Sequence, residues 1–191
     1  GGNTAVGHQS MANGVVTGLH NTGLGDGSLL VLTSGAYNTG LGKDALAANT
    51  TASSNVAIGI AALGANTTGA ENVATGAFCL EANTTGAQNT AIGHRALDAN
   101  TSANNNTAVG FAALGANTTG TANTAVGGAA GDAITTGGYN TAVGQSSLTA
   151  LTTGGSNTAV GYAAGQGLTG ASNFNVAIGD ETMLIAGEKS Y

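Results

Sequence analysis

Two acidic side chains stand at a spacing that could place them side by side. Glu81 and Asp98 are 17 residues apart, which is the period of the repeat described below. If successive repeats stack, their carboxyl groups lie about 5 Å apart, the separation found in retaining glycosidases. The alternative is two solvated carboxylates on an exposed strand. We favour the alternative, because neither a cleft nor an aromatic platform accompanies the pair.

Other polar pairs follow from the same spacing. Asp26 and Lys43 predict a surface ion pair of small energetic value. His94 and Phe111 predict a stacked pair of rings. His8 occupies the same repeat position, but five repeats separate it from His94, which is too far for shared metal ligation.

The remaining chemistry-bearing residues predict no reaction. Cys79 stands where other repeats have alanine, which predicts a small buried thiol. The sequence contains no Cys/His cluster, acidic calcium repeat or phosphate loop. We therefore expect no catalytic residue, cofactor or metal site, and we expect that the protein is not an enzyme.

The elements that position these residues are eleven copies of one unit, such as NTAVGFAALGANTTGTA from position 106. Successive units are 17 residues long, except for 18 in the first and tenth, and they predict a single repeat domain over residues 1–191. Such strict periodicity is typical of a solenoid. Each unit opens on an asparagine: Asn3, Asn21, Asn38, Asn55, Asn72, Asn89, Asn106, Asn123, Asn140, Asn157 and Asn175.

Composition limits the partners. Only 6% of residues are charged, the net charge is −6, and the chain has three Lys+Arg. These values argue against binding to nucleic acid or to an anionic membrane surface. No apolar run reaches membrane-spanning length, so no membrane insertion is expected. The chain starts at Gly-Gly without Met, which predicts a processed or excised piece.

We number the unit from its asparagine, as positions 1 to 17. Positions 2 to 4, such as Thr107-Ala108-Val109, carry β-branched residues two apart and predict a strand. We expect positions 2 and 4 to face the core and the small position 3 to face outward. Asparagine and glycine accept left-handed backbone angles, so we expect both at the turns. The turn glycines are Gly7, Gly25, Gly42, Gly59, Gly76, Gly93, Gly110, Gly127, Gly144, Gly161 and Gly179.

The second half of the unit adds apolar positions. Position 9 is Leu or Met in nine copies. Position 12 exchanges Asn for large apolar residues and is expected to face inward. Ile134 and Leu168 occupy it in the two copies where position 9 is Gly131 or Gly165, which predicts compensation of core volume.

The fold class predicted is all-β. It is a parallel β-solenoid (β-roll) of eleven 17-residue turns about 4.8 Å apart, in a rod about 50 Å long. The position-1 asparagines would form an amide ladder. One slender coil has a thin core and therefore little hydrophobic stabilisation. Side-by-side association, for example as a trimer, would add to that stabilisation. An outward, small position 3 would allow that approach; alternatively it is small only because the turn is tight.

Two periodic surfaces invite functional interpretations. The N-x-[ST] pattern occurs at Asn49, Asn66, Asn83, Asn100, Asn105 and Asn117. Read literally, it marks glycosylation acceptors, but we expect the position-12 asparagines to point inward and stay unmodified. Threonines at positions 13 and 14 resemble the regular arrays of ice-binding solenoids, although only one of two adjacent columns would be exposed.

The pentads NVAIG at 55–59 and 175–179 resemble the repeats of YadA-like heads in trimeric autotransporter adhesins. That resemblance implies a left-handed parallel β-roll with three chains side by side, although the repeats of that family are shorter. The full unit is similar to repeat shafts of phage-tail-fibre-type surface proteins, which often precede an endosialidase-type chaperone domain. The resemblance covers the whole chain, implies an extracellular place on a cell or virion surface, and carries no catalytic residue.

We therefore expect a structural fibre, stalk or spacer that assembles with itself. Axial assembly would continue the asparagine column from Asn175 to Asn3 of the next chain. Charges gather in the last repeat, where they could blunt its edge or dock it on a partner: Asp180, Glu181, Glu188 and Lys189. The alternatives are an adhesin or carbohydrate-binding module that takes surface glycans, and an ice-binding solenoid. An adhesin should cluster its aromatic residues, whereas the tyrosines are scattered: Tyr37, Tyr139, Tyr162 and Tyr191.

Overall fold

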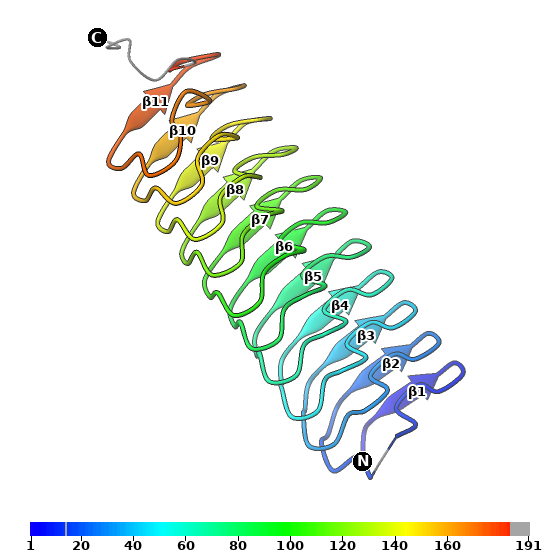
Figure 1. Cartoon of the computed structure of the whole chain (residues 1–191). Coiled ribbons are helices and arrows are strands. Elements are labelled where there is room, and N and C mark those ends of the chain that lie inside the picture. The colour runs from blue at the N-terminus through cyan, green and yellow to red at the C-terminus, as the bar shows by residue number, and fades with distance from the viewer. Residues whose placement is uncertain (14, 184–191) are drawn as a thin grey trace.

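The computed structural model describes residues 1–13 and 15–183. It is all-β over that range: eleven parallel strands form one sheet, in chain order from β1 to β11. Figure 1 shows the strands stacked one above another along a rod, with a long loop returning from each strand to the next. The predicted parallel β-solenoid is confirmed, with ten complete turns and the first half of an eleventh. Glu188, Lys189 and Tyr191 lie outside the described residues.

Each strand is the three-residue segment that follows a position-1 asparagine. Neighbouring strands pair in strict register, as Val56 with Val73 and Ala57 with Ala74, so equivalent residues form columns along the rod. The strands are β1 (Thr4–Val6), β2 (Thr22–Leu24), β3 (Thr39–Leu41), β4 (Val56–Ile58), β5 (Val73–Thr75), β6 (Thr90–Ile92), β7 (Thr107–Val109), β8 (Thr124–Val126), β9 (Thr141–Val143), β10 (Thr158–Val160) and β11 (Val176–Ile178).

The two faces of the strands are the reverse of our prediction. From β2 to β11 the middle residue is buried, and the residues on either side of it are exposed or half-buried. The reason is the narrow interior of each turn. A Cβ built on Gly40 would lie 2.6 Å from Ser28 Oγ and 3.4 Å from Leu29 Cγ. Only a small residue fits there, so the valine and isoleucine side chains lie outside.

The core consists of the small residues at positions 3 and 8 and the large apolar residues at position 9. Leu46, Leu63 and Leu97 are fully buried. The predicted volume compensation is confirmed: a Cβ on Gly131 would lie 3.1 Å from Ile134 Cδ1. Ile134 therefore occupies the space that a position-9 leucine fills in other turns.

Left-handed backbone angles fall at unexpected positions. The position-5 glycines have φ between 119° and 138°, as expected. The position-1 asparagines are not left-handed, so that part of the prediction is wrong. Non-glycine residues at positions 7, 9 and 17 take these angles instead, for example Ala61 (53°), Leu63 (51°) and Glu71 (60°).

The left-handed residues at positions 7 and 9 lie in two consecutive tight turns. The Ala62 N–H donates to the Gly59 carbonyl at 3.4 Å, and the Gly64 N–H donates to the Ala61 carbonyl at 3.0 Å. Each bond closes a four-residue turn whose third residue has positive φ, the type II pattern. A left-handed non-glycine residue costs about 1–2 kcal/mol. Bonds to the next turn offset that cost, as when the Leu63 N–H donates to the Cys79 carbonyl at 3.0 Å.

The position-1 asparagines form a ladder that ties each turn to its neighbour. The backbone N–H and Nδ2 of Asn55 both donate to Asn38 Oδ1, at 3.0 and 3.2 Å. Asn55 Nδ2 also donates to the carbonyl of Gly69, at the end of the same turn, at 3.0 Å. The side chain therefore closes its own turn and binds the preceding one. Asn21 to Asn157 are buried in this ladder, and Asn3 and Asn175 bond at its two ends.

A second ladder runs through the middle turns at position 12. Asn83 Nδ2 donates to Asn66 Oδ1 at 2.9 Å, and Asn66 Nδ2 donates to the Gly69 carbonyl at 2.9 Å. One carbonyl therefore accepts from both ladders. The prediction that position 12 faces inward is confirmed, since these asparagines are fully buried. The ladder ends at Asn117, whose Oδ1 is buried without a partner because the next residue in the column is Ile134.

Candidate functional site

Most columns of the rod form the core or the hydrogen-bonded ladders. The candidate functional residues lie in columns where the side chain varies from turn to turn. Position 6 follows the left-handed glycine that ends each strand, so its side chain leaves the sheet at one edge of the rod. It carries a different residue type in almost every turn. We call this column the variable edge: His8, Asp26, Lys43, Ile60, Ala77, His94, Phe111, Gly128, Gln145, Tyr162 and Asp180.

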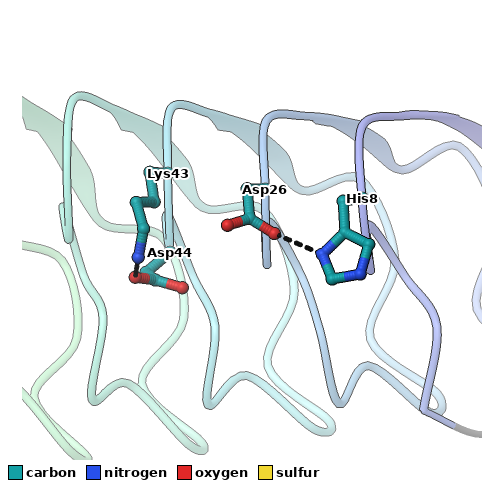
Figure 2. Close-up of polar contacts among 4 residues, drawn as sticks. All are labelled: His8, Asp26, Lys43 and Asp44. Atoms are coloured by element: carbon teal, nitrogen blue, oxygen red, sulfur yellow. Dashed lines mark hydrogen bonds and ion pairs between the residues drawn. The ribbon is translucent and has the colours of Figure 1, made fainter.

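The first turns of the variable edge are polar (Figure 2). His8 Nδ1 lies 2.9 Å from Asp26 Oδ1, and Lys43 Nζ lies 2.8 Å from Asp44 Oδ2. The predicted pair of Asp26 with Lys43 is therefore wrong. Asp44, the next residue along the chain, is within direct reach of Lys43, while Asp26 is turned to His8. All four side chains are exposed, so these pairs contribute little stability.

The middle turns of the variable edge carry rings. The predicted stack is confirmed: the centroids of His94 and Phe111 are 5.7 Å apart and their planes are 4° from parallel. Phe78, from position 7, meets His94 edge-on at 5.9 Å. The guanidinium carbon of Arg95 lies 6.0 Å from the centre of the Phe78 ring. The sequence argument missed Phe78 because it compared residues only within one column.

The two carboxylates considered for acid–base chemistry belong to consecutive turns, as their spacing requires. Glu81 is exposed, whereas Asp98 is half-buried. Burial raises the pKa of Asp98, and the charge of Arg95 partly opposes that rise. Burial also raises the pKa of Asp132, whose Oδ1 is buried without a hydrogen-bond partner. The turns joining these positions are held by backbone bonds, such as the Ala82 N–H to the Asp98 carbonyl at 3.1 Å.

Cys79 is a structural residue. Its side chain is fully buried, and Sγ lies 3.1 Å from the Ala91 carbonyl, to which the thiol donates. Burial raises the pKa of the thiol to about 12, so it stays protonated at neutral pH. The prediction of a small buried thiol is confirmed.

The asparagines of the N-x-[ST] pattern and the threonines at positions 13 and 14 differ in their exposure to solvent. At position 12, Asn66 and Asn83 are fully buried with their Nδ2 atoms bonded, so neither presents an amide to solvent. Asn105, at position 17, is exposed. At position 13, hydroxyls such as that of Thr84 donate to the carbonyl one turn on, at 3.0 Å. Position 14, for example Thr85, is exposed, and Thr84 at position 13 is exposed as well, so the expectation that only one of the two adjacent threonine columns reaches solvent is wrong at this turn.

A second ring pair lies at position 17, on the other side of the strands. His20 and Tyr37 stack with centroids 5.3 Å apart. Both residues immediately precede a position-1 asparagine, so the same column search would have found the pair had the longer first copy been aligned at its end. Tyr139 stands exposed in this column six turns further on.

Two searches of the described ranges, 1–13 and 15–183, bear on other kinds of site. No group of three or more His, Cys, Asp or Glu side chains there could hold a metal ion. No helix in those ranges is long and apolar enough to cross a membrane. Compared with known proteins, the chain matches no family model, no curated protein and no solved structure.

Proposed function

We propose that this protein is a structural segment of an extracellular fibre or shaft, on a cell or virion surface, and that it assembles with copies of itself. The observation that carries the proposal is the outward face of the sheet. Positions 2 and 4 of all eleven strands bear only Thr, Val, Ile and Leu, without a single charge. A contiguous, uncharged face with exposed aliphatic side chains is typical of an interaction surface.

The size of this strand face supports lateral association. Eleven strands at about 4.8 Å, each about 10 Å long, give roughly 500 Å² per chain. Two such faces together bury about 1,000 Å², the lower limit for a specific interface. Leu41, Ile58 and Ile92 are 40%, 37% and 43% exposed in the single chain, so aliphatic surface is available along the rod.

The route to association differs from the one that the sequence predicted. Position 3 is buried, so its small residues do not admit a neighbouring chain. The aliphatic column at position 4 takes that role in the proposal, and three chains side by side is the arrangement implied by the resemblance to YadA-like heads. In the axial direction, Asn175 already donates to Asn157 Oδ1, at 2.9 Å from Nδ2. Asn3 of another chain would extend this ladder by the same bonds.

The test is sedimentation of the wild-type chain and of Val126→Lys over a wide range of concentrations. We expect the wild type to form oligomers, and Val126→Lys to dissociate them because it buries a charge in the proposed interface. Thr119→Lys, at the exposed position 14, is the matched control and should associate like the wild type. A wild-type chain that stays monomeric when concentrated would contradict the proposal, as would equal association of both variants.

Ice binding is the alternative that one observation favours. Position 2 carries outward threonine in five consecutive turns, and this array uses the strand face rather than positions 13 and 14. The five are Thr90, Thr107, Thr124, Thr141 and Thr158. Thermal hysteresis of the monomer that is abolished by Thr124→Lys would support this alternative over the fibre.

A further inference from the structure

The stack of rings on the variable edge stops abruptly at Gly128. His94 covers one face of the Phe111 ring, with the two planes 4° from parallel. The other face of Phe111 looks toward the next turn, where the same position is Gly128. Phe111 is 63% exposed. The second face of the Phe111 ring therefore has no side chain stacked on it from the next turn.

Gly128 is not a glycine that the backbone requires. Its neighbour Gly127 has a φ of 136°, and a Cβ there would lie 2.6 Å from the carbonyl oxygen of Gly144. A Cβ on Gly128, by contrast, would have no atom within 4 Å, and its φ lies outside the left-handed range. The absence of a side chain at Gly128 leaves open space that packing and backbone geometry do not explain.

The far side of this space is polar. Gln145 follows in the same column and is exposed. Two turns separate it from Phe111, which places their backbones about 10 Å apart. That spacing accommodates one ring in contact with the Phe111 face, together with a hydrogen-bonding amide on its other side. The Gly128 carbonyl at the base of this space is already bonded, because it accepts from the Ser146 N–H at 3.0 Å.

We propose that Phe111, Gly128 and Gln145 form a binding position for one uncharged pyranose ring of a glycan. The C–H face of a pyranose is apolar and packs on an aromatic face, while its hydroxyls match the donor and acceptor of a glutamine amide. None of the three residues carries a charge, and the net charge of −6 disfavours acidic sugars.

The position is compatible with the proposed fibre and does not depend on it. Residue 111 follows Gly110, beyond the end of β7, so the site lies outside the strand face. For a single shallow site we expect a dissociation constant of about 1–10 mM, which corresponds to a binding free energy of about −3 to −4 kcal/mol. Repetition of the site on associated chains would raise the effective affinity for a polymeric glycan by multivalency.

The experiment is saturation-transfer NMR of the full chain with the methyl pyranosides of glucose, galactose, mannose and N-acetylglucosamine. We expect at least one of these pyranosides to bind. Phe111→Ala should weaken that binding about tenfold by removing the platform. Gly128→Phe should abolish it by filling the gap, with an unchanged circular dichroism spectrum. Tyr37→Ala, which removes an exposed ring at the other edge, is the matched control and should bind like the wild type.

Three results would overturn the inference. One is the absence of a signal from all four pyranosides at tens of millimolar. Another is undiminished binding by folded Gly128→Phe and Phe111→Ala. The third is binding of indole, used as a flat aromatic probe, to the Phe111 face in place of every sugar, which would make the ligand class wrong.

Discussion

Asn89 offers the most direct test of how neighbouring turns are held together. Its Oδ1 accepts the backbone N–H of Asn106 at 3.0 Å. Its Nδ2 donates to the Ala103 carbonyl at 2.8 Å and to Asn72 Oδ1 at 3.1 Å. All of these groups are buried. Asn89→Ala removes the three bonds and leaves the chain otherwise unchanged.

The expected cost follows from those bonds. The Asn106 N–H loses its acceptor, and a stranded buried donor costs about 1–3 kcal/mol. The two bonds from Nδ2 are worth about 0.5–1.5 kcal/mol each. The Ala103 carbonyl keeps a second donor, Asn100 Nδ2 at 3.2 Å, and adds no further penalty. We therefore expect the free energy of unfolding to fall by about 2–6 kcal/mol.

Urea unfolding followed by far-ultraviolet circular dichroism measures this loss. The control is Asn105→Ala, at the exposed residue that immediately precedes Asn106; the same position in the next copy is already alanine with a positive φ, as Ala122. Because repeat proteins are stabilised by nearest neighbours, hydrogen exchange should speed up most in the turns next to residue 89. Equal unfolding midpoints for the two variants would refute the claim that the ladder stabilises the rod.

Three further predictions follow from burial. Ala108→Asp should lower the melting temperature severely because it places an unpaired charge in the core, whereas Val109→Asp in the monomer should be mild; equal effects would contradict the face assignment. Intact-mass spectrometry should find no glycan on Asn66, and a hexose-sized addition there would show that position 12 is accessible. Burial raises the Asp132 pKa above its ordinary 3.8, so the folded chain binds a proton more tightly than the unfolded chain. Stability should therefore increase as the pH falls from 7 through the folded pKa, with the gain complete below 3.8. Asp132→Asn should raise the melting temperature at pH 7 and reduce that gain, and a variant with unchanged pH dependence would rule the residue out.

The architecture was predictable because it depends on periodicity. A strict repeat of 17 residues fixes which residues stack, so the asparagine ladder and the His94–Phe111 pair could be inferred before the structure. Comparison of the copies also predicted that Ile134 fills the space left by the missing leucine at Gly131. The ladder and the ring pair require only that equivalent residues lie one turn apart, and the Gly131–Ile134 compensation requires only a comparison of the copies. They do not require knowledge of which way a side chain points.

The alternation of residues along a strand did not predict which side chains face the core. A three-residue strand such as Val56-Ala57-Ile58 has one small and two large apolar residues, and hydrophobicity assigns the large ones to the core. The narrow interior of the turn decides otherwise. The tight turns that enclose it contain left-handed residues at positions 7 and 9. Ala61 and Leu63 give no sequence signal for positive φ, because neither is Gly, Asn or Asp.

The candidate site was only partly predictable for the same reason. The ring stack follows from spacing, but the open space beyond Phe111 depends on what surrounds Gly128. In the sequence Gly127 and Gly128 look alike. Only the backbone angles and the neighbouring carbonyl separate a glycine that the turn requires from one that leaves room.

Two-dimensional class averages of the concentrated wild-type chain in the electron microscope test the central claim most directly. The proposed fibre segment predicts rods lying side by side in register, with their strand faces turned toward one another. Each segment should be about 50 Å long, with turns about 4.8 Å apart. Averages containing only isolated single rods, with the strand face toward solvent, would contradict the account.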